Sequence, residues 1–261
     1  METQTLNHDR TDLWVTRFDE VVEPALLDEY RALITDNEAL RAARFIFERD
    51  RQQFLVTRAL VRTVLSRYAD VDPRDWRFAE NQFGKPYVSG PGDLPVAFNL
   101  SHTAGLVVCA VAATETIGVD VERMDREVEY LNIAKRFFAE TEWQLVKSAP
   151  SDRRAEVFFR VWTLKEAYIK AHGSGLSVPL SSFTVLPSND MPPSLELLDS
   201  SPGGGDRWQF AQLVLDERFQ VAVCMDAATT ELEVCVHDHV PLREKQPATS
   251  SPPKKTGVAE N

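Results

Sequence analysis

The sequence VWTLKEAYIK at residues 161–170 decides how this chain folds and where its chemistry lies. Apolar residues recur there at helical spacing and predict an amphipathic helix over 154–171, ended by Gly173. The apolar stripe of this helix consists of Phe158, Val161, Trp162, Tyr168 and Ile169. Glu166 and Lys170 are four residues apart, so they share one face. They form either a surface ion pair or part of a site for a metal ion and a phosphate.

Residues 117–122, which read IGVDVE, place two acids upstream of this helix. The pattern is typical of a strand, where alternate side chains share a face, so Asp120 and Glu122 point the same way. Two such carboxylates repel unless a cation neutralises them. Mg²⁺ binds one or two carboxylates and completes its shell with water and phosphate oxygens. The two acids therefore predict, with Glu166, a partial magnesium site; a solvated strand face is the alternative.

Two segments before the acids carry groups that suit a phosphate. Ser101 and His102 end a predicted strand and offer a hydroxyl, an imidazole and backbone N–H groups. Lys85 lies between Gly84 and Pro86 in a predicted turn, where the backbone can approach a ligand closely. An ordinary turn without a ligand is the alternative for each segment.

The pattern of apolar residues predicts an α+β protein with two comparable parts. Helices are expected at 24–34, 38–68, 130–138, 140–148 and 154–171. Short strands are expected at 13–18, from 76, and at 96–101, 106–113, 117–122, 183–186, 194–198, 208–215, 219–225 and 232–236. Arg41 lies near the start of the second helix and is a candidate for a phosphate contact, and Thr141 is the expected cap of the fourth. Helices and strands follow one another twice without a regular βαβ repeat, which favours α+β.

The charge and the cysteines restrict the class of protein. The formal net charge of −11 argues against general binding to nucleic acid or to an anionic membrane, so any phosphate site must be a local basic patch. Three cysteines in apolar runs, Cys109, Cys224 and Cys235, indicate free thiols in a reducing compartment. No apolar run reaches the ~20 residues of a membrane span, and the polar start of the chain does not resemble a signal peptide. These features predict a cytoplasmic protein.

Four motifs in this order make the chain resemble the Sfp-type 4′-phosphopantetheinyl transferases. They are GKP at 84–86, FNLSH at 98–102, GVDVE at 118–122 and WTLKEAYIK at 162–170. The resemblance covers about residues 40 to 225. It implies two similar α+β halves related by pseudo-twofold symmetry, with the active site in the cleft between them. The expected divisions are 1–115, 116–241 and a tail at 242–261 that is predicted to be disordered, because it is rich in Pro, Ser, Lys and Glu.

The resemblance also implies a function for each candidate residue. By position, Asp120, Glu122 and Glu166 would bind Mg²⁺, and Glu166 and Lys170 would be catalytic. The residues that would bind CoA are Arg41, Gly84, Lys85, Pro86, Ser101, His102 and Lys170. Glu38 departs from the pattern, because some relatives carry a second basic residue one turn before Arg41. That departure weakens the predicted phosphate patch at this helix start.

The activity implied by the resemblance is transfer of the 4′-phosphopantetheine arm of CoA to a serine of an apo carrier protein. Acyl, peptidyl and aryl carriers of fatty-acid, polyketide or non-ribosomal peptide synthesis all fit, and the protein would be a monomer that binds neither nucleic acid nor membrane. Because carriers and this chain are both acidic, we expect an apolar docking surface. Its candidate residues are Tyr130, Leu131, Ile133 and Phe137, for which a place in the core is the alternative.

Two other functions compete with this one. A different Mg²⁺-dependent enzyme that cleaves pyrophosphates would also need clustered acids, and a non-catalytic partner of a synthase would keep the fold without the reaction. The intact acids argue against the second, since a scaffold does not need them. The sequence contains no Walker A, G-x-G-x-x-G or G-x-S-x-G motif, which removes the common nucleotide-hydrolase, dinucleotide-binding and α/β-hydrolase classes.

Overall fold

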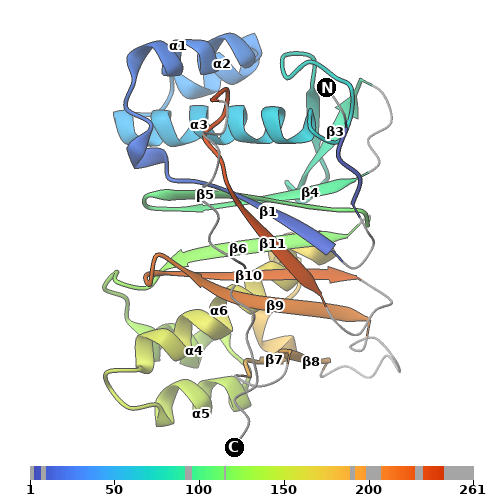
Figure 1. Ribbon diagram of the computed structural model, residues 1–261. Helices are drawn as coiled ribbons and strands as arrows, with labels where there is room; N and C mark the ends of the chain where they lie inside the picture. The colour runs from blue at the N-terminus through green and yellow to red at the C-terminus, as the bar shows by residue number, and fades with distance from the viewer. Residues whose placement is uncertain are drawn as a thin grey trace, which may run out of the picture.

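The computed structural model confirms an α+β protein built in layers. It describes residues 3–6, 10–91, 96–114, 116–188, 192–197, 207–226 and 232–243. Figure 1 shows two sheets packed one above the other, with helices α1, α2 and α3 over the first and helices α4, α5 and α6 beyond the second. Among the described residues no helix is both long and apolar enough to cross a bilayer.

The first sheet has four strands in the order β11-β1-β5-β4. Their bounds are β1 Arg10–Thr16, β4 Ala97–Thr103, β5 Leu106–Ala112 and β11 Glu233–Asp238. Its helices are α1 Pro24–Leu33, α2 Asp36–Ala42 and α3 Glu48–Leu65, after a short 3-10 turn at Phe18–Glu20. A separate hairpin consists of β2 Arg77–Glu80 and β3 Pro86–Gly90. Trp14, Tyr30, Leu60 and Trp76 are completely or almost completely buried between the helices and this sheet.

The second sheet has three antiparallel strands in the order β6-β10-β9. Their bounds are β6 Ile117–Arg123, β9 Trp208–Leu215 and β10 Phe219–Asp226. Helices α4 Tyr130–Phe137, α5 Glu140–Ser148 and α6 Arg154–His172 accompany it, with 3-10 turns at Gly175–Ser177 and Leu180–Ser182 and a hairpin of β7 Phe183–Leu186 and β8 Ser194–Leu197. The predicted helix over 154–171 is therefore confirmed, and Gly173 follows it with φ 77° in the left-handed region.

A shared apolar layer joins the two sheets. Alternate residues of β1 and β5, such as Leu13 and Val108, pack against alternate residues of β6 and β10, such as Val119 and Val221. Side chains on one face of a strand recur with period two, so each strand presents a row of apolar side chains to the other sheet. All these side chains are buried. The opposite face of β10 packs with Ala222 and Cys224 on helix α6. The position of α6 is thereby fixed against the centre of the molecule.

Two local predictions were wrong. The helix expected over 38–68 is broken after Ala42, because Arg51 of α3 donates to the carbonyls of Ala42 and Phe45 and satisfies the end of α2. Thr141 does not cap the helix predicted over 140–148, which is α5 in the structure. Helix α5 begins at Glu140, and its first turn is held by the Glu142 carboxylate, which accepts from the backbone N–H of Ala139.

Strand β11, the last strand among the described residues, belongs to the first sheet. β11 pairs in parallel with β1, although its neighbours in sequence belong to the second sheet. Asp12 secures this pairing, since its carboxylate accepts from Tyr68 at 2.7 Å and lies 2.9 Å from the His237 ring nitrogen. The division into 1–115 and 116–241 stays a prediction, and the expected tail lies outside the described residues from 244 onward.

Candidate active site

The acids of β6 and the cations of α6 meet because helix and strand touch backbone to backbone. Gly118 makes this possible: a Cβ atom there would lie 2.0 Å from the carbonyl oxygen of Ala167 and 2.4 Å from the backbone nitrogen of Ala171. Only glycine leaves room for such an approach. The contact brings Lys170 of α6 against Asp120 of β6.

A network of short hydrogen bonds joins Asp120, Lys170 and Ser101. The Lys170 ammonium donates to Asp120 Oδ1 at 2.7 Å, to Ser101 Oγ at 2.9 Å and to the carbonyl of Val119 at 3.1 Å. Ser101 donates to the same Asp120 oxygen at 2.9 Å and accepts from the backbone N–H of Val121. Three of the predicted site residues therefore lie together, and β4 is tied to β6 through them.

One oxygen of this network is left without a partner. Asp120 is buried, yet its Oδ2 makes no hydrogen bond. A buried carboxylate oxygen without a donor is costly. Arg62 Nε and Arg154 Nε are also buried without a partner, but the Asp120 oxygen differs from them because its residue lines a pocket that two further acids share, which indicates a group that the site is built to receive.

The other two acids lie around Asp120 and share its pocket. Burial and the charge of Asp120 raise the pKa of Glu122 to about 7, although Arg126 lies 3.1 Å from its carboxylate. Burial and Asp120 also raise the pKa of Glu166, against the effect of Lys170. Both shifts mean that negative charge is crowded here and that a cation would relieve it.

We call the cavity around these acids the acid pocket. Its volume is about 800 Å³, and it is lined by Asp120, Glu122, Arg136, Phe137, Trp162, Glu166 and the turn Val178, Pro179, Leu180 and Ser181. The lining thus combines three acids with apolar side chains. Of the expected docking residues, Phe137 lines this pocket and is partly exposed, whereas Tyr130, Leu131 and Ile133 pack partly buried against the α4–α6 core.

A smaller pocket of about 220 Å³ adjoins the other side of Lys170. It is lined by Phe83, Gly84, Lys85, Pro86, Asn99, Leu100, Ile169, Lys170, Gly173 and Gly175. His102 lies near the end of β4, and its residue as a whole is exposed. Neighbouring protein atoms still displace part of the water around its ring, and this desolvation, together with the charge of Lys170, lowers its pKa. Residues from both 1–115 and 116–241 therefore form the walls around Lys170.

Lys85 lies in this pocket, but its ammonium is already bonded to protein. It donates to the carbonyls of Ile117 at 3.0 Å and Ala171 at 3.1 Å, and burial lowers its pKa to about 8. Asn81 of the same turn donates to the carbonyl of Gly173. The turn that contains Gly84, whose φ is 84°, is thereby fixed to the carboxyl end of α6.

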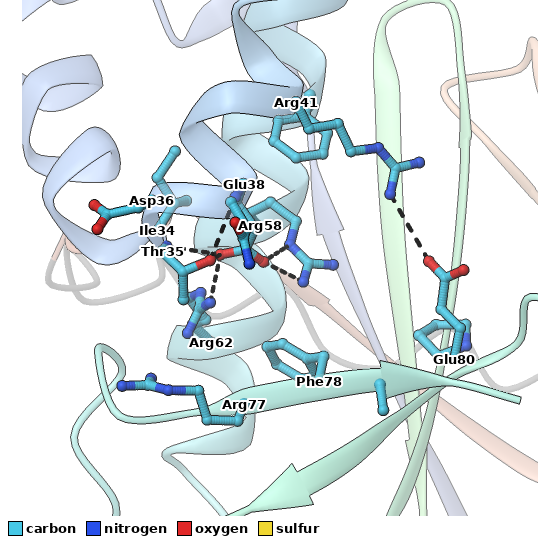
Figure 2. Close-up of a pocket in the computed structure, with 14 residues that line it drawn as sticks. Ile34, Thr35, Asp36, Glu38, Arg41, Arg58, Arg62, Arg77, Phe78 and Glu80 are labelled. Atoms are coloured by element: carbon cyan, nitrogen blue, oxygen red, sulfur yellow. Dashed lines mark hydrogen bonds and ion pairs between the residues drawn. The ribbon is translucent and has the colours of Figure 1, made fainter.

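Arg41 lies apart from the acids, in a third pocket of about 780 Å³ that shares Pro86 with the smaller one. Its side chain is 65% exposed and lies 3.7 Å from Glu80. Figure 2 shows Glu38 between Arg58 and Arg62 in the same pocket. The Glu38 carboxylate neutralises both arginines, at 2.5 Å from Arg58 Nε and 2.6 Å from Arg62 Nη2.

Three residues around the site were not predicted to belong to it, although two of them, Asn99 and Trp162, lie in the quoted motifs. Arg136 and Trp162 line the acid pocket, and Asn99 accepts from the backbone N–H of Val119 and so helps Ser101 to hold β4 against β6. Asn99 lies two residues before Ser101 on the strand, and this spacing could have shown that both point to the same neighbour.

The acids suit a magnesium ion that is completed by other ligands. In the part of the chain that the structure describes, no three His, Cys, Asp or Glu side chains are grouped so as to hold a metal ion by themselves. Mg²⁺ needs only one or two carboxylates when water and phosphate supply the rest. The unpartnered oxygen of Asp120 and the crowded carboxyls of Glu122 and Glu166 fit that kind of site.

Comparison with known families gives matches along most of the chain. Residues 116–224 match the model of the 4′-phosphopantetheinyl transferase superfamily, and residues 24–115 match that of the 4′-phosphopantetheinyl transferase N-terminal region.

Individual proteins show the same likeness. The 4′-phosphopantetheinyl transferase HetI of Nostoc sp. is 32% identical over 85% of this chain and 90% of its own length. The 4′-phosphopantetheinyl transferase Sfp of Bacillus subtilis is 35% identical over 76% of this chain and 84% of its own length. A solved holo-(acyl-carrier-protein) synthase from Bacillus anthracis, in complex with CoA (3′,5′-ADP), is 24% identical over 42% of this chain and 92% of that chain, with a TM-score of 0.35.

Proposed function

Because this chain belongs to the 4′-phosphopantetheinyl transferase family, we propose that the acid pocket and the groups around Lys170 are its active site. The reaction of the enzyme is CoA-dependent phosphopantetheinyl transfer to carrier proteins. The observation that carries the assignment of the site is the unpartnered, buried Oδ2 of Asp120 beside two further carboxyls. A non-catalytic fold without a bound cation has no use for such an oxygen.

The proposed metal ligands are Asp120, Glu122 and Glu166. When bound there, Mg²⁺ would neutralise charge on the pyrophosphate of CoA. The three acids would hold it on the side of the pocket where their carboxyls crowd. Relief of the repulsion between these carboxyls would then favour binding of the ion.

The proposed chemical step is a displacement at phosphorus. The carrier serine oxygen forms a bond to the phosphorus that bears the pantetheine arm, and the bond from that phosphorus to the bridging oxygen breaks. Adenosine 3′,5′-bisphosphate leaves with the electron pair, and the serine proton passes to the Glu166 carboxylate, directly or through a water. Lys170 would bind the pyrophosphate by charge-assisted hydrogen bonds, and the site would act mainly by positioning and charge neutralisation.

The nucleotide end of CoA would lie across the smaller pocket. We propose that Gly84, Pro86, His102 and Arg41 contact it. The Lys85 ammonium donates two of its three N–H groups to protein carbonyls, and we propose that the third contacts CoA. The Ser101 hydroxyl donates to Asp120 and accepts from Lys170 and Val121, so it would shape the site through the strand that carries it.

Several finer properties stay proposals. We propose that 1–115 and 116–241 are similar halves related by pseudo-twofold symmetry and that the active site lies in a cleft between them. The walls around Lys170, which come from both segments, support this. A monomeric enzyme in a reducing cytoplasm that binds neither nucleic acid nor membrane is the remaining prediction, and the three free cysteines support the reducing compartment alone.

Intact-mass spectrometry tests the function directly. An apo carrier protein is incubated with the enzyme, CoA and Mg²⁺, and a parallel sample contains EDTA. A gain of one phosphopantetheine mass that EDTA abolishes is the expected result. No gain on acyl, peptidyl and aryl carriers, with a folded enzyme, would contradict it and favour a pyrophosphate-cleaving enzyme or a synthase partner. Release of products from CoA without a carrier separates the last two.

A further inference from the structure

A buried ion pair lies directly behind the acid pocket. Lys165 precedes the pocket residue Glu166 on α6, and its ammonium lies 2.5 Å from Glu142 Oε1 of α5. Both side chains are 0% exposed. Burying two charges is expensive, and a well-packed apolar pair is often at least as stable. Stability alone therefore does not account for these residues.

Every contact of the pair is to a segment that carries a wall of the pocket. The Glu142 carboxylate accepts from the backbone N–H of Ala139 at 2.9 Å and of Val185 at 2.7 Å, in addition to Lys165. The Lys165 ammonium donates to the carbonyl of Phe183 at 2.7 Å and lies 4.2 Å from the centre of the Phe183 ring. Together these bonds satisfy the charges on both side chains.

Two of the segments held in this way adjoin apolar parts of the pocket lining, which we call its two walls. Ala139 comes two residues after Phe137, the first wall, and Phe183 comes two residues after Ser181, which ends the second wall at 178–181. Lys165 itself is next to Glu166. The pair therefore joins the helix that carries the acid to the segments that carry both walls.

We propose that Glu142 and Lys165 are positioning residues, which set the distance between Glu166 and the two apolar walls of the acid pocket. They touch neither the pocket nor a substrate, and they act through the backbone of Ala139, Phe183 and Val185. This inference rests on the proposed function of the acid pocket. Reactions that depend on positioning lose about 10²-fold in rate for a misplacement of about 1 Å, so loosening the walls should affect catalysis before it affects folding.

The test uses a double variant that removes both charges together. Glu142→Gln with Lys165→Met leaves no unpaired buried charge, whereas either single change would. The matched control is Tyr68→Phe, which removes buried hydrogen bonds to Asp12 and Trp14 in the first core, away from the pocket. Transfer kinetics are measured for CoA and for the carrier, well below each melting temperature, and hydrogen exchange is followed at 136–139 and 178–185.

The expected result separates position from stability. In the double variant kcat falls by about tenfold or more, the KM for CoA changes by less than about threefold because its proposed nucleotide contacts lie elsewhere, and exchange rises at the two walls. Tyr68→Phe lowers the melting temperature but leaves kcat and the exchange of these walls unchanged. Wild-type kinetics in the double variant, or an equal loss of kcat in both variants, would overturn the proposal.

Failure of the proposed function can be distinguished from failure of this inference. If the wild-type protein transfers nothing to any carrier, the proposed function fails, and exchange at the two walls still reports on the pair. Faster exchange there in the double variant alone supports the positioning role. Unchanged exchange refutes it without reference to activity.

Discussion

Helix α6 carries two lysine–carboxylate pairs five residues apart, and they differ in how completely they are satisfied. The pair of Lys165 and Glu142 is fully buried, and its carboxylate accepts from the ammonium and from two backbone N–H groups. The pair of Lys170 and Asp120 is partly open, with the lysine side chain 27% exposed and one carboxylate oxygen unpartnered. In the buried pair, every charged group has partners within the protein. In the pair of Lys170 and Asp120, which we call the open pair, one carboxylate oxygen can still accept a bond from a ligand.

This difference shows that an ion pair by itself does not identify an active site. Both pairs have short contacts, and both lysines belong to the same motif. What distinguishes them is the surplus of negative charge beside Asp120, where the pKa values of Glu122 and Glu166 are raised. Perturbed groups with unused bonding capacity in a pocket are the sign of function.

The largest expected effect comes from removing an acid of the open pair or its neighbour. Asp120→Ala or Glu166→Ala should lower transfer by about 10³-fold or more, since each removes a proposed ligand of the Mg²⁺ that would neutralise the phosphates. Circular dichroism should show an intact fold. Glu156→Ala, an acid on the exposed side of the same helix that pairs with Arg153, should leave the rate unchanged. Near-normal kcat in either pocket variant would sink the assignment of these acids.

Substitution of Lys165 should chiefly lower stability, whereas substitution of Lys170 should chiefly lower the rate of transfer. Lys165→Met leaves Glu142 buried without its counter-charge and should cost about 3–5 kcal/mol of the free energy of unfolding. Lys170→Met should cost less, because that pair is partly hydrated, yet it should lower transfer more strongly than it lowers stability. Urea unfolding and mass-resolved transfer, run on both variants, check this. Equal stability losses would show that the two pairs do not differ as described.

The raised pKa of Glu122 predicts a slope of stability with pH. Between the ordinary glutamate value of about 4.3 and the folded value of about 7, the folded state binds more protons than the unfolded state. The contribution of Glu122 to stability is then fully present below this range and is lost, by about 3–4 kcal/mol, as the pH rises through it. Urea unfolding with EDTA from pH 5 to 8 measures the slope. Glu122→Gln should flatten it, and an unaltered slope in that variant would assign the effect to another group.

The smallest effects should come from the nucleotide end. His102→Ala should raise the KM for CoA by about tenfold with little change in kcat, as for a residue that binds ground and transition states alike. Arg41→Ala should raise it less, because Arg41 is exposed and already faces Glu80. Steady-state kinetics with varied CoA give both values. If CoA binds the His102 variant as tightly as the wild type, the predicted contact is wrong.

The sequence predicted what depends on local periodicity. Helix α6 and strand β6 follow from their 3.6-residue and two-residue patterns, and the α+β class follows from their order. Failures occurred where a distant residue decides the outcome. The break after Ala42 depends on Arg51, nine residues later, whose guanidinium satisfies the end of the first helix. The pairing of β11 with β1 joins residues more than 200 positions apart.

The candidate site was likewise predictable in its acids and less so in its cations. Alternation placed Asp120 and Glu122 on one face, and the helix placed Lys170 near them. The bonds of the Lys85 ammonium to Ile117 and Ala171 could not be foreseen, because they require knowing how the β2–β3 turn packs on α6. Lys165 lies beside the apolar stripe of the helix, where an unpaired ammonium would be costly, but its partner Glu142 has no signal in the sequence beyond its place as the third residue of a helix.

Gly118 determines how closely strand β6 approaches helix α6 in this enzyme. Because β6 and α6 rest on each other at this point without an intervening side chain, their separation is fixed by the size of backbone atoms, the least variable parts of any protein. A single methyl group at position 118 would act as a wedge and would lift Glu166 and Lys170 away from Asp120 together. The absence of a side chain at Gly118 thus fixes the distance between the acids of β6 and the acid and lysine of α6.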